Sequence, residues 1–361
     1  MREKALYVHI PFCQGICPYC DFNKTLYRPE WGKRFASKLL GEIAALTGPF
    51  SSIYLGGGTP TCLALPLLGQ ILSALRGLLE EGGEFDIEGN PESFDGPLCR
   101  LLYDSGITRV SIGAQSSQDA ILHSLGRRHR HEDTVRAVMN LLSSGIDNIN
   151  LDLIYASPNS SVHTATVDAK AFSALPITHV SAYSLILEKG TYFSFSGVKE
   201  LSQDEQGAQF EAIEGVLSRH GMSRYEVSSF CKKGRECAHN LAYWEDKPYL
   251  ALGPGASGYD GNAHYSIKRG LFEYFEYGSR RVYEEEREKD KIEIFLLTNL
   301  RLAKGFELNR FRLLFGKAEL QTLLEKAKPM AEAGLLRISS GRLSPTNRGL
   351  NLLDSVLVSL F

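Results

Sequence analysis

Short apolar runs alternate with longer amphipathic segments along the first half of the chain. Six runs have the length and composition of strands, and they lie at 5–10, 52–55, 85–88, 109–112, 148–154 and 179–184. Segments with helical periodicity follow them at 31–46, 65–79, 97–104, 118–125, 134–142 and 164–174. This alternation predicts right-handed βαβ units and a mainly parallel α/β sheet, either open and doubly wound or closed into a partial barrel. In both architectures functional residues are expected at the carboxyl ends of the strands.

The pattern changes after about residue 203. A helix is predicted at 205–219, and the following stretch, 225–259, is rich in aromatic residues and glycine and has weak periodicity. The charged run 284–291 predicts the solvated first turn of a helix, and the remainder reads helix, helix, hairpin, helix, as in a winged-helix module. We therefore expect three parts, a βα part at 1–200, an irregular α+β segment at 201–283 and a winged-helix-like helical module at 284–361.

Composition and charge exclude several classes of function. The 361 residues suffice for two to three domains, and 40 basic against 42 acidic residues argue against a dedicated nucleic-acid-binding protein. No apolar run reaches the roughly 18 residues needed to cross a bilayer. The first residues also lack the apolar segment of a signal peptide. We expect a soluble, cytoplasmic protein.

Three of the seven cysteines lie within eight residues. Cys13, Cys17 and Cys20 form a C-x3-C-x2-C pattern just after the first predicted strand, and the other four cysteines are scattered. Thiolates bind zinc, copper(I) or iron–sulfur clusters, but a closed zinc site usually takes four ligands from two separated pairs. Three thiolates on a four-iron cluster leave one iron free to coordinate a small molecule. An iron–sulfur cluster is favoured, while zinc and inert buried thiols remain alternatives.

The segment YVHIPFCQGICPYCDFN resembles the cluster loop of the radical S-adenosylmethionine (SAM) superfamily. It is most similar to the branch that contains oxygen-independent coproporphyrinogen III oxidase and the HemW-type haem chaperones, and the resemblance extends from Tyr7 to about Leu302. It implies a six-unit partial (β/α) barrel with a [4Fe–4S] cluster on Cys13, Cys17 and Cys20. In that superfamily SAM chelates the fourth iron, and an electron from the cluster splits it to a 5′-deoxyadenosyl radical.

Polar residues near the strand ends suit a zwitterionic nucleoside ligand. The turn at 56–60, GGGTP, permits close approach of the backbone, while carboxylates suit ammonium and hydroxyl groups and arginine suits a carboxylate. By resemblance, the residues matching the family's SAM contacts are Tyr7, Tyr19, Gly57, Gly58, Thr59, Glu88, Gln115, Arg127, Asp152 and Ile186.

Two features separate the chaperones from the oxidase. Phe22 stands where the oxidase carries a further cysteine, and only twelve residues precede Cys13, whereas the oxidase has a long extension that covers its active site. The segment 239–244, HNLAYW, matches the HNxxYW motif of the HemW-type proteins, which implies His239 as a haem ligand, with Cys231 and Cys237 as alternatives.

The resemblance therefore implies a haem chaperone that binds a cluster, SAM and haem and delivers haem to acceptor proteins. Respiratory enzymes at the membrane surface are the expected acceptors, and a homodimer is compatible with the resemblance. No oxidase activity is expected and no catalytic residue is assigned. The alternatives are oxygen-independent coproporphyrinogen III oxidase and a zinc-stabilised barrel that binds a nucleotide without redox chemistry.

Overall fold

The computed structural model describes residues 4–361, so the first three residues of the predicted 1–200 part lie outside the described residues. All six predicted strands lie in one sheet as parallel neighbours. In sheet order they are β1 (Ala5–Ile10), β4 (Phe50–Gly57), β5 (Leu79–Gly89), β6 (Arg109–Gln115), β7 (Ile149–Tyr155) and β8 (His179–Ser184). The succession of adjacent parallel strands confirms the six-unit partial barrel.

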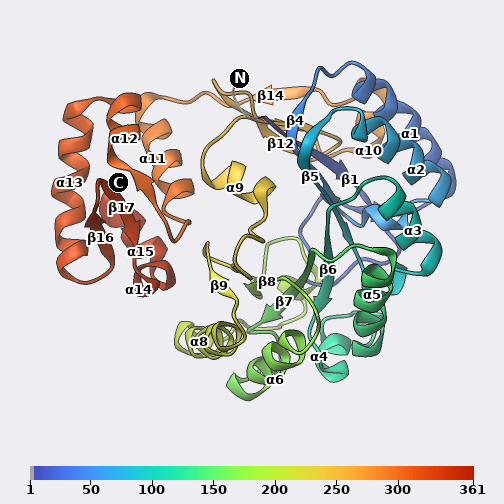
Figure 1. Ribbon diagram of the computed structural model, residues 1–361, viewed down its shortest axis with the longest axis horizontal. Coiled ribbons are helices and arrows are strands. Elements are labelled where there is room, and N and C mark those ends of the chain that lie inside the picture. Colours follow the sequence, from blue (N-terminus) through green and yellow to red (C-terminus); the bar gives the residue numbers. More distant parts are fainter. Residues whose placement is uncertain (1–3) are drawn as a thin grey trace.

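The predicted helices follow these strands and cover the outer face of the sheet (Figure 1). They are α1 (Pro29–Ala44), α2 (Leu65–Arg76), α3 (Gly96–Asp104), α4 (Asp119–Ser124), α5 (His131–Ser144) and α6 (Val162–Ser173). Two short 3-10 turns, η1 (Pro60–Cys62) and η2 (Pro91–Ser93), follow β4 and β5. The cluster cysteines lie after β1, where β2 (Phe12–Cys13) pairs with β3 (Thr25–Leu26).

Side chains alternate along each barrel strand between an apolar outer face and a polar inner face. Outward residues such as Ile53, Phe85 and Leu151 are fully buried against the helices, and each such burial contributes about 1.5–3 kcal/mol. The inward positions carry polar side chains, namely Ser52, Tyr54, Glu84, Asp86, Glu88, Arg109, Ser111, Asn150, Asp152, His179 and Ser181. A barrel packed only for stability would fill these positions with branched apolar residues, so the interior is shaped for polar contacts.

Residues 223–283 extend the sheet at both edges, which the weak periodicity of this region did not predict. β10 (Ser229–Cys231) joins β8 and β9 (Ser223–Arg224) joins β10, both antiparallel. On the other side β11 (Tyr249–Leu252) runs parallel to β1 and is followed by β12 (Ser257–Tyr259), β13 (His264–Ile267) and β14 (Arg281–Tyr283). These strands have only two to four residues each, so they are too short for a hydrophobic pattern to identify.

The helices of this middle region are α7 (Tyr192–Phe195), α8 (Gln203–Arg219), α9 (Ala238–Trp244) and α10 (Leu271–Tyr277). The predicted helix at 205–219 corresponds to α8. This helix begins with a capping box formed by Ser202 and Glu205. Helix α9 carries the HNLAYW segment and lies between the barrel and the C-terminal part (Figure 1).

The C-terminal part has an apolar core of its own around Phe295, Phe306 and Phe311. Its elements are α11 (Glu288–Asn299), β15 (Phe306–Glu307), α12 (Leu308–Phe315), α13 (Lys317–Glu332), β16 (Leu336–Ser339), β17 (Arg342–Pro345), α14 (Asn347–Asn351) and α15 (Leu353–Leu360). The predicted helices and hairpin are present, whereas α12 and β15 were not predicted. No helix within residues 4–361 combines the length and the apolar character that a bilayer span requires.

Candidate functional site

A cavity of about 410 Å³ opens where the barrel strands reach their carboxyl ends. The cluster loop forms one wall, and strand ends and the loops after them form the others. Of the residues predicted to bind the cluster or SAM, those that line this cavity are Cys13, Cys17, Tyr19, Cys20, Gly57, Gly58, Thr59, Glu88, Gln115, Arg127, Asp152 and Ile186. The structure thus brings together all of them except Tyr7.

The three loop cysteines are free thiols on the cavity wall. The Thr59 hydroxyl donates to Cys13 Sγ at 3.6 Å, and Arg127 Nη1 donates to Cys17 Sγ at 3.4 Å. Burial raises the pKa of the Cys13 thiol to about 11. Their three sulfur atoms do not all lie within 4.8 Å of one another. A spacing wider than this suits a cluster of several irons, in which each thiolate binds a different iron.

The glycines after β4 are required by close packing against the cluster loop. Gly57 has a φ of +109°, and a Cβ there would lie 2.5 Å from the His9 ring. At Gly58 a Cβ would lie 2.5 Å from the Phe12 carbonyl oxygen. Glycine at both positions lets the end of β4 approach the cluster loop closely. The Thr59 amide therefore donates to the Phe12 carbonyl at 2.7 Å. The glycines thus position the loop as well as lining the cavity.

Two inward carboxylates lie across the cavity from the cluster loop. Glu88 accepts hydrogen bonds from the Tyr54 hydroxyl at 2.7 Å and from the Gly57 amide at 3.1 Å. Burial raises its pKa to about 7, and the nearby Asp152 adds to the shift. Asp152 accepts from Asn150 Nδ2 at 2.8 Å, and burial raises its pKa to about 6. These carboxylates are suited to accept hydrogen bonds from ammonium or hydroxyl groups of a ligand.

Gln115 and Arg127 leave polar atoms without partners in the cavity wall. Gln115 ends β6 in the left-handed region at φ +65°, next to a shift in strand register. Arg127 Nη2 donates to Asn90 Oδ1 and to the Gly113 carbonyl, each at 2.8 Å. Gln115 Oε1 and Arg127 Nε are buried without a hydrogen-bond partner. Buried polar atoms are normally paired, so these atoms fit a polar ligand.

Tyr7 is partly buried, whereas Ile186 is exposed. Tyr7 is held inside the barrel, where its hydroxyl bonds His9 Nδ1 at 3.1 Å, and it is not part of the cavity wall. Ile186 is 58% exposed at the cavity wall, where Ile16 and Phe22 of the cluster loop are also exposed. These three side chains give the cavity an apolar rim.

His239 is fully buried behind the cavity rather than in its wall. Its Nδ1 bonds Ser52 Oγ at 2.9 Å and its Nε2 bonds the Tyr243 hydroxyl at 2.6 Å. Burial lowers the pKa of the ring to about 3, so the imidazole is neutral near pH 7. Its neighbour Asn240 reaches the cavity wall. Both ring nitrogens are therefore occupied in this conformation.

The alternative haem ligands are also buried. Cys231 lies in β10, and Cys237 caps the start of α9, where its sulfur accepts from the Asn240 amide at 3.5 Å. Neither lines the cavity.

Several cavity residues were not singled out from the sequence, among them Arg109, Ser111, Asn150 and Ser181. Each occupies an inward position of a strand whose outward neighbours are apolar. The alternation in RVSIG, NLDLI and HVSAYS carries this signal and could have identified them.

Comparisons with known proteins agree with this geometry. The family model of the radical SAM superfamily matches residues 7–166, and that of the HemN C-terminal domain matches residues 287–352. The heme chaperone HemW of Lactococcus lactis is 32% identical over 98% of this chain and 96% of that protein, and that of Bacillus subtilis is 30% identical over 96% of each. The solved coproporphyrinogen III oxidase of Escherichia coli has the same fold, with a TM-score of 0.85 and 19% identity over 99% of this chain and 90% of that chain.

Proposed function

Because this chain belongs to the family of the heme chaperone HemW proteins within the radical SAM superfamily, we propose that it binds haem and passes it to haem-requiring proteins. The observation that carries the proposal is the position of α9. This helix bears the HNLAYW segment, and Asn240 reaches the cofactor cavity while His239 stacks on Tyr54 at 5.1 Å between ring centroids. The haem motif and the cofactor site are therefore in contact through side chains.

The cofactors are a [4Fe–4S] cluster and SAM, with haem as cargo. The three cysteines and Arg127 hold the cluster side of the cavity, and a bound cluster supplies a single electron at low potential. Glu88 and Asp152 would accept hydrogen bonds from the ammonium and hydroxyl groups of SAM, and the unpartnered oxygen of Gln115 would accept a further one. Tyr19 and Ile186 cover the ligand at the apolar rim.

His239 is proposed as the axial ligand of haem iron. The neutral imidazole is the form that binds iron, and the lowered pKa keeps this ring neutral at pH 7. To bind, the ring has to release either Tyr243 from Nε2 or Ser52 from Nδ1. Haem binding at His239 therefore requires either a turn of the Tyr243 side chain within α9 or a separation of the His239 ring from Ser52 of β4. If the ring stays in place, Cys231 and Cys237 are the next candidates.

The proposal extends to partners, location and domain organisation. Acceptors are haem-requiring proteins, with respiratory enzymes at the membrane surface as the specific expectation, and a homodimer is part of the proposal. A cytoplasmic location suits the seven free cysteines, because cytosolic thiols are kept reduced. The separate apolar core of the last part supports a division into 1–200, 201–283 and 284–361.

One sample of anaerobically reconstituted protein tests the function. Half is titrated with haem and half is supplied with coproporphyrinogen III, SAM and a reductant. We expect a shifted Soret band on haem addition and no protoporphyrinogen. His239→Ala should weaken or alter the haem spectrum, while His163→Ala, at an exposed position of α6, should leave it unchanged. Formation of protoporphyrinogen would contradict the chaperone function and support oxidase activity instead. Fold similarity alone is compatible with that alternative.

A further inference from the structure

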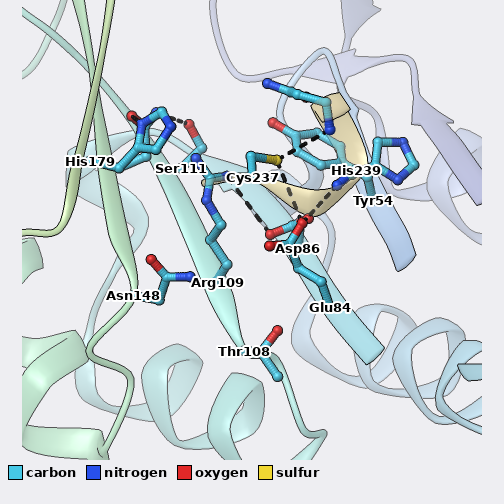
Figure 2. Close-up of polar contacts among 12 residues, drawn as sticks. Tyr54, Glu84, Asp86, Thr108, Arg109, Ser111, Asn148, His179, Cys237 and His239 are labelled. Carbon is cyan, nitrogen blue, oxygen red and sulfur yellow. Dashed lines mark hydrogen bonds and ion pairs between the residues drawn. The ribbon is translucent and has the colours of Figure 1, made fainter. Parts of the chain in front are cut away.

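A second group of ligand-type side chains lies inside the barrel, nearer the amino end of β5 than the cofactor cavity. Glu84 and Asp86 precede Glu88 on the inward face of β5, and Cys237 comes from the start of α9 (Figure 2). One oxygen of each of the two carboxylates and the Cys237 sulfur lie within 4.8 Å of one another. Across residues 4–361 this is the one group of three or more such side chains with that spacing.

Asp86 provides the observation that points to a ligand. Its side chain is 1% exposed, and apart from a contact with the neighbouring Glu84 carboxyl its oxygens have no hydrogen-bond partner. The neighbouring cation is Arg109, whose Nη1 lies 3.7 Å from Asp86 Oδ1, beyond hydrogen-bond length. Buried carboxylates in native proteins are almost always paired. Apart from Glu84, the oxygens of Asp86 therefore lack the close donor or cation that a buried carboxylate normally has.

The charge of the group favours a divalent cation. With Cys237 as a thiolate and both carboxylates ionised, as in a metal-bound form, three negative charges would face the single positive charge of Arg109, which is itself 2% exposed. An uncompensated charge away from water is strongly unfavourable. A cation with two positive charges would bring the group to neutrality.

We propose that Glu84, Asp86 and Cys237 bind a divalent transition-metal ion, with zinc preferred. A thiolate selects a borderline-soft ion such as zinc over magnesium or calcium, and zinc accepts sulfur and carboxylate oxygen together. The three side chains fill three tetrahedral positions and water takes the fourth. The Cys237 thiol, whose sulfur lies 3.6 Å from Glu84 Oε1, releases its proton to solvent when the ion binds.

The position of these three side chains bears on how an ion could approach them and on what its binding would do to α9. A second cavity of about 490 Å³ is lined by Glu84 together with Gly83, Ala238 and Lys247, so one of the three proposed ligands borders a solvent-filled space. The His239 amide also donates to Glu84 Oε1 at 2.9 Å. A metal ion bound here would fix the first turn of α9 to β5.

Cys237→Ser is the decisive variant. Serine keeps a side chain that can accept the capping hydrogen bond from the Asn240 amide, but it removes the thiolate. Cys231→Ser is the matched control, because Cys231 is another buried cysteine and lies outside the group. Cluster-loaded chains are dialysed anaerobically against dilute Zn²⁺ and the retained zinc is measured by mass spectrometry. We expect about one zinc per chain in the parent and in Cys231→Ser, and a clear loss in Cys237→Ser.

A second arm removes the competing thiols. In a chain with Cys13, Cys17 and Cys20 replaced by alanine, Co²⁺ should produce a sulfur-to-cobalt charge-transfer band that Cys237→Ser abolishes. Asp86→Asn should lower the Zn²⁺ affinity by at least about tenfold while leaving the thiolate in place. Equal zinc content in the parent and in Cys237→Ser, or no zinc in the parent, would overturn the proposal. Neither arm uses haem or SAM, so failure here is distinct from failure of the chaperone function.

Discussion

The imidazole of His239 stacks on the ring of Tyr54, with the planes 28° from parallel. The hydroxyl of Tyr54 in turn donates to Glu88 in the cofactor cavity. One side chain of β4 therefore contacts both the proposed haem ligand and a proposed SAM ligand. Its ring and its hydroxyl serve different neighbours, so the two contacts can be removed separately.

Tyr54→Phe should weaken SAM binding without affecting haem. The phenylalanine ring keeps the stack on His239 but cannot donate to Glu88. The lost bond positions Glu88 rather than contacting SAM itself, so the affinity for SAM should fall by less than the about 1.5–3 kcal/mol that a hydrogen bond to a charged group contributes. Calorimetric titration with SAM measures the first effect and a Soret titration the second. Tyr103→Phe, at an exposed tyrosine of α3, is the control. Equal losses of SAM and haem affinity would show that the hydroxyl serves both sites, which would contradict the separation of the two contacts.

Replacing Cys13, Cys17 or Cys20 by alanine should abolish the cluster. The reconstituted parent should contain about four iron and four sulfide per chain, because the three thiolates are the protein ligands of a cubane. Iron and sulfide analysis with absorbance of the brown chromophore measures this. Cys62→Ala and Cys99→Ala remove buried thiols from η1 and α3 and should retain the cluster. A Cys17→Ala protein with full iron and sulfide would contradict the assignment.

Asp152→Asn and Glu88→Gln should lower SAM affinity by about tenfold to a hundredfold while iron content stays unchanged. Each change preserves shape but replaces a carboxylate oxygen by an amide that cannot accept as strongly. Binding of SAM to cluster-loaded protein is the measurement. Glu132→Gln, on the exposed side of α5, should bind SAM like the parent. If both site variants kept the parent affinity, the ligand would lie elsewhere.

His129 should contribute stability at neutral pH that is lost between pH 6.5 and pH 4. This ring is buried, and burial lowers its pKa from 6.5 to about 4. The unfolded chain therefore takes up a proton in this range before the folded chain does. Stability is fully present above pH 6.5 and up to about 3 kcal/mol is lost as the pH falls through 4, at about 1.4 kcal/mol per pKa unit.

His129→Gln should flatten this part of the pH profile. A glutamine amide can keep the hydrogen bond to the Ala114 carbonyl, which His129 Nε2 makes at 3.0 Å. Urea unfolding at a series of pH values measures the difference. His163→Gln changes an exposed histidine and should keep the parent slope. If the stability of His129→Gln depended on pH as that of the parent does, His129 would not be the cause of the loss.

The sequence was most informative where elements are long and the chemistry is local. The six barrel strands and their helices have enough residues to show a period, and the cluster loop carries three cysteines within eight residues. The short strands β9 to β14 depend on pairing with distant partners, so their own residues do not predict them. Nor does a motif show accessibility: HNLAYW indicated His239, but only packing against Ser52 and Tyr243 shows that both ring nitrogens are occupied.

The pairing of β1 with β11 has a consequence for biosynthesis. Ala5 lies beside Tyr249 and Val8 beside Leu252, so the first strand completes its ladder only with a segment translated more than 240 residues later. Until then one edge of β1 has free backbone groups, and such an edge can pair with other chains. The nascent chain therefore has a late, long-range step in folding, which slows folding and favours protection by the cellular folding machinery.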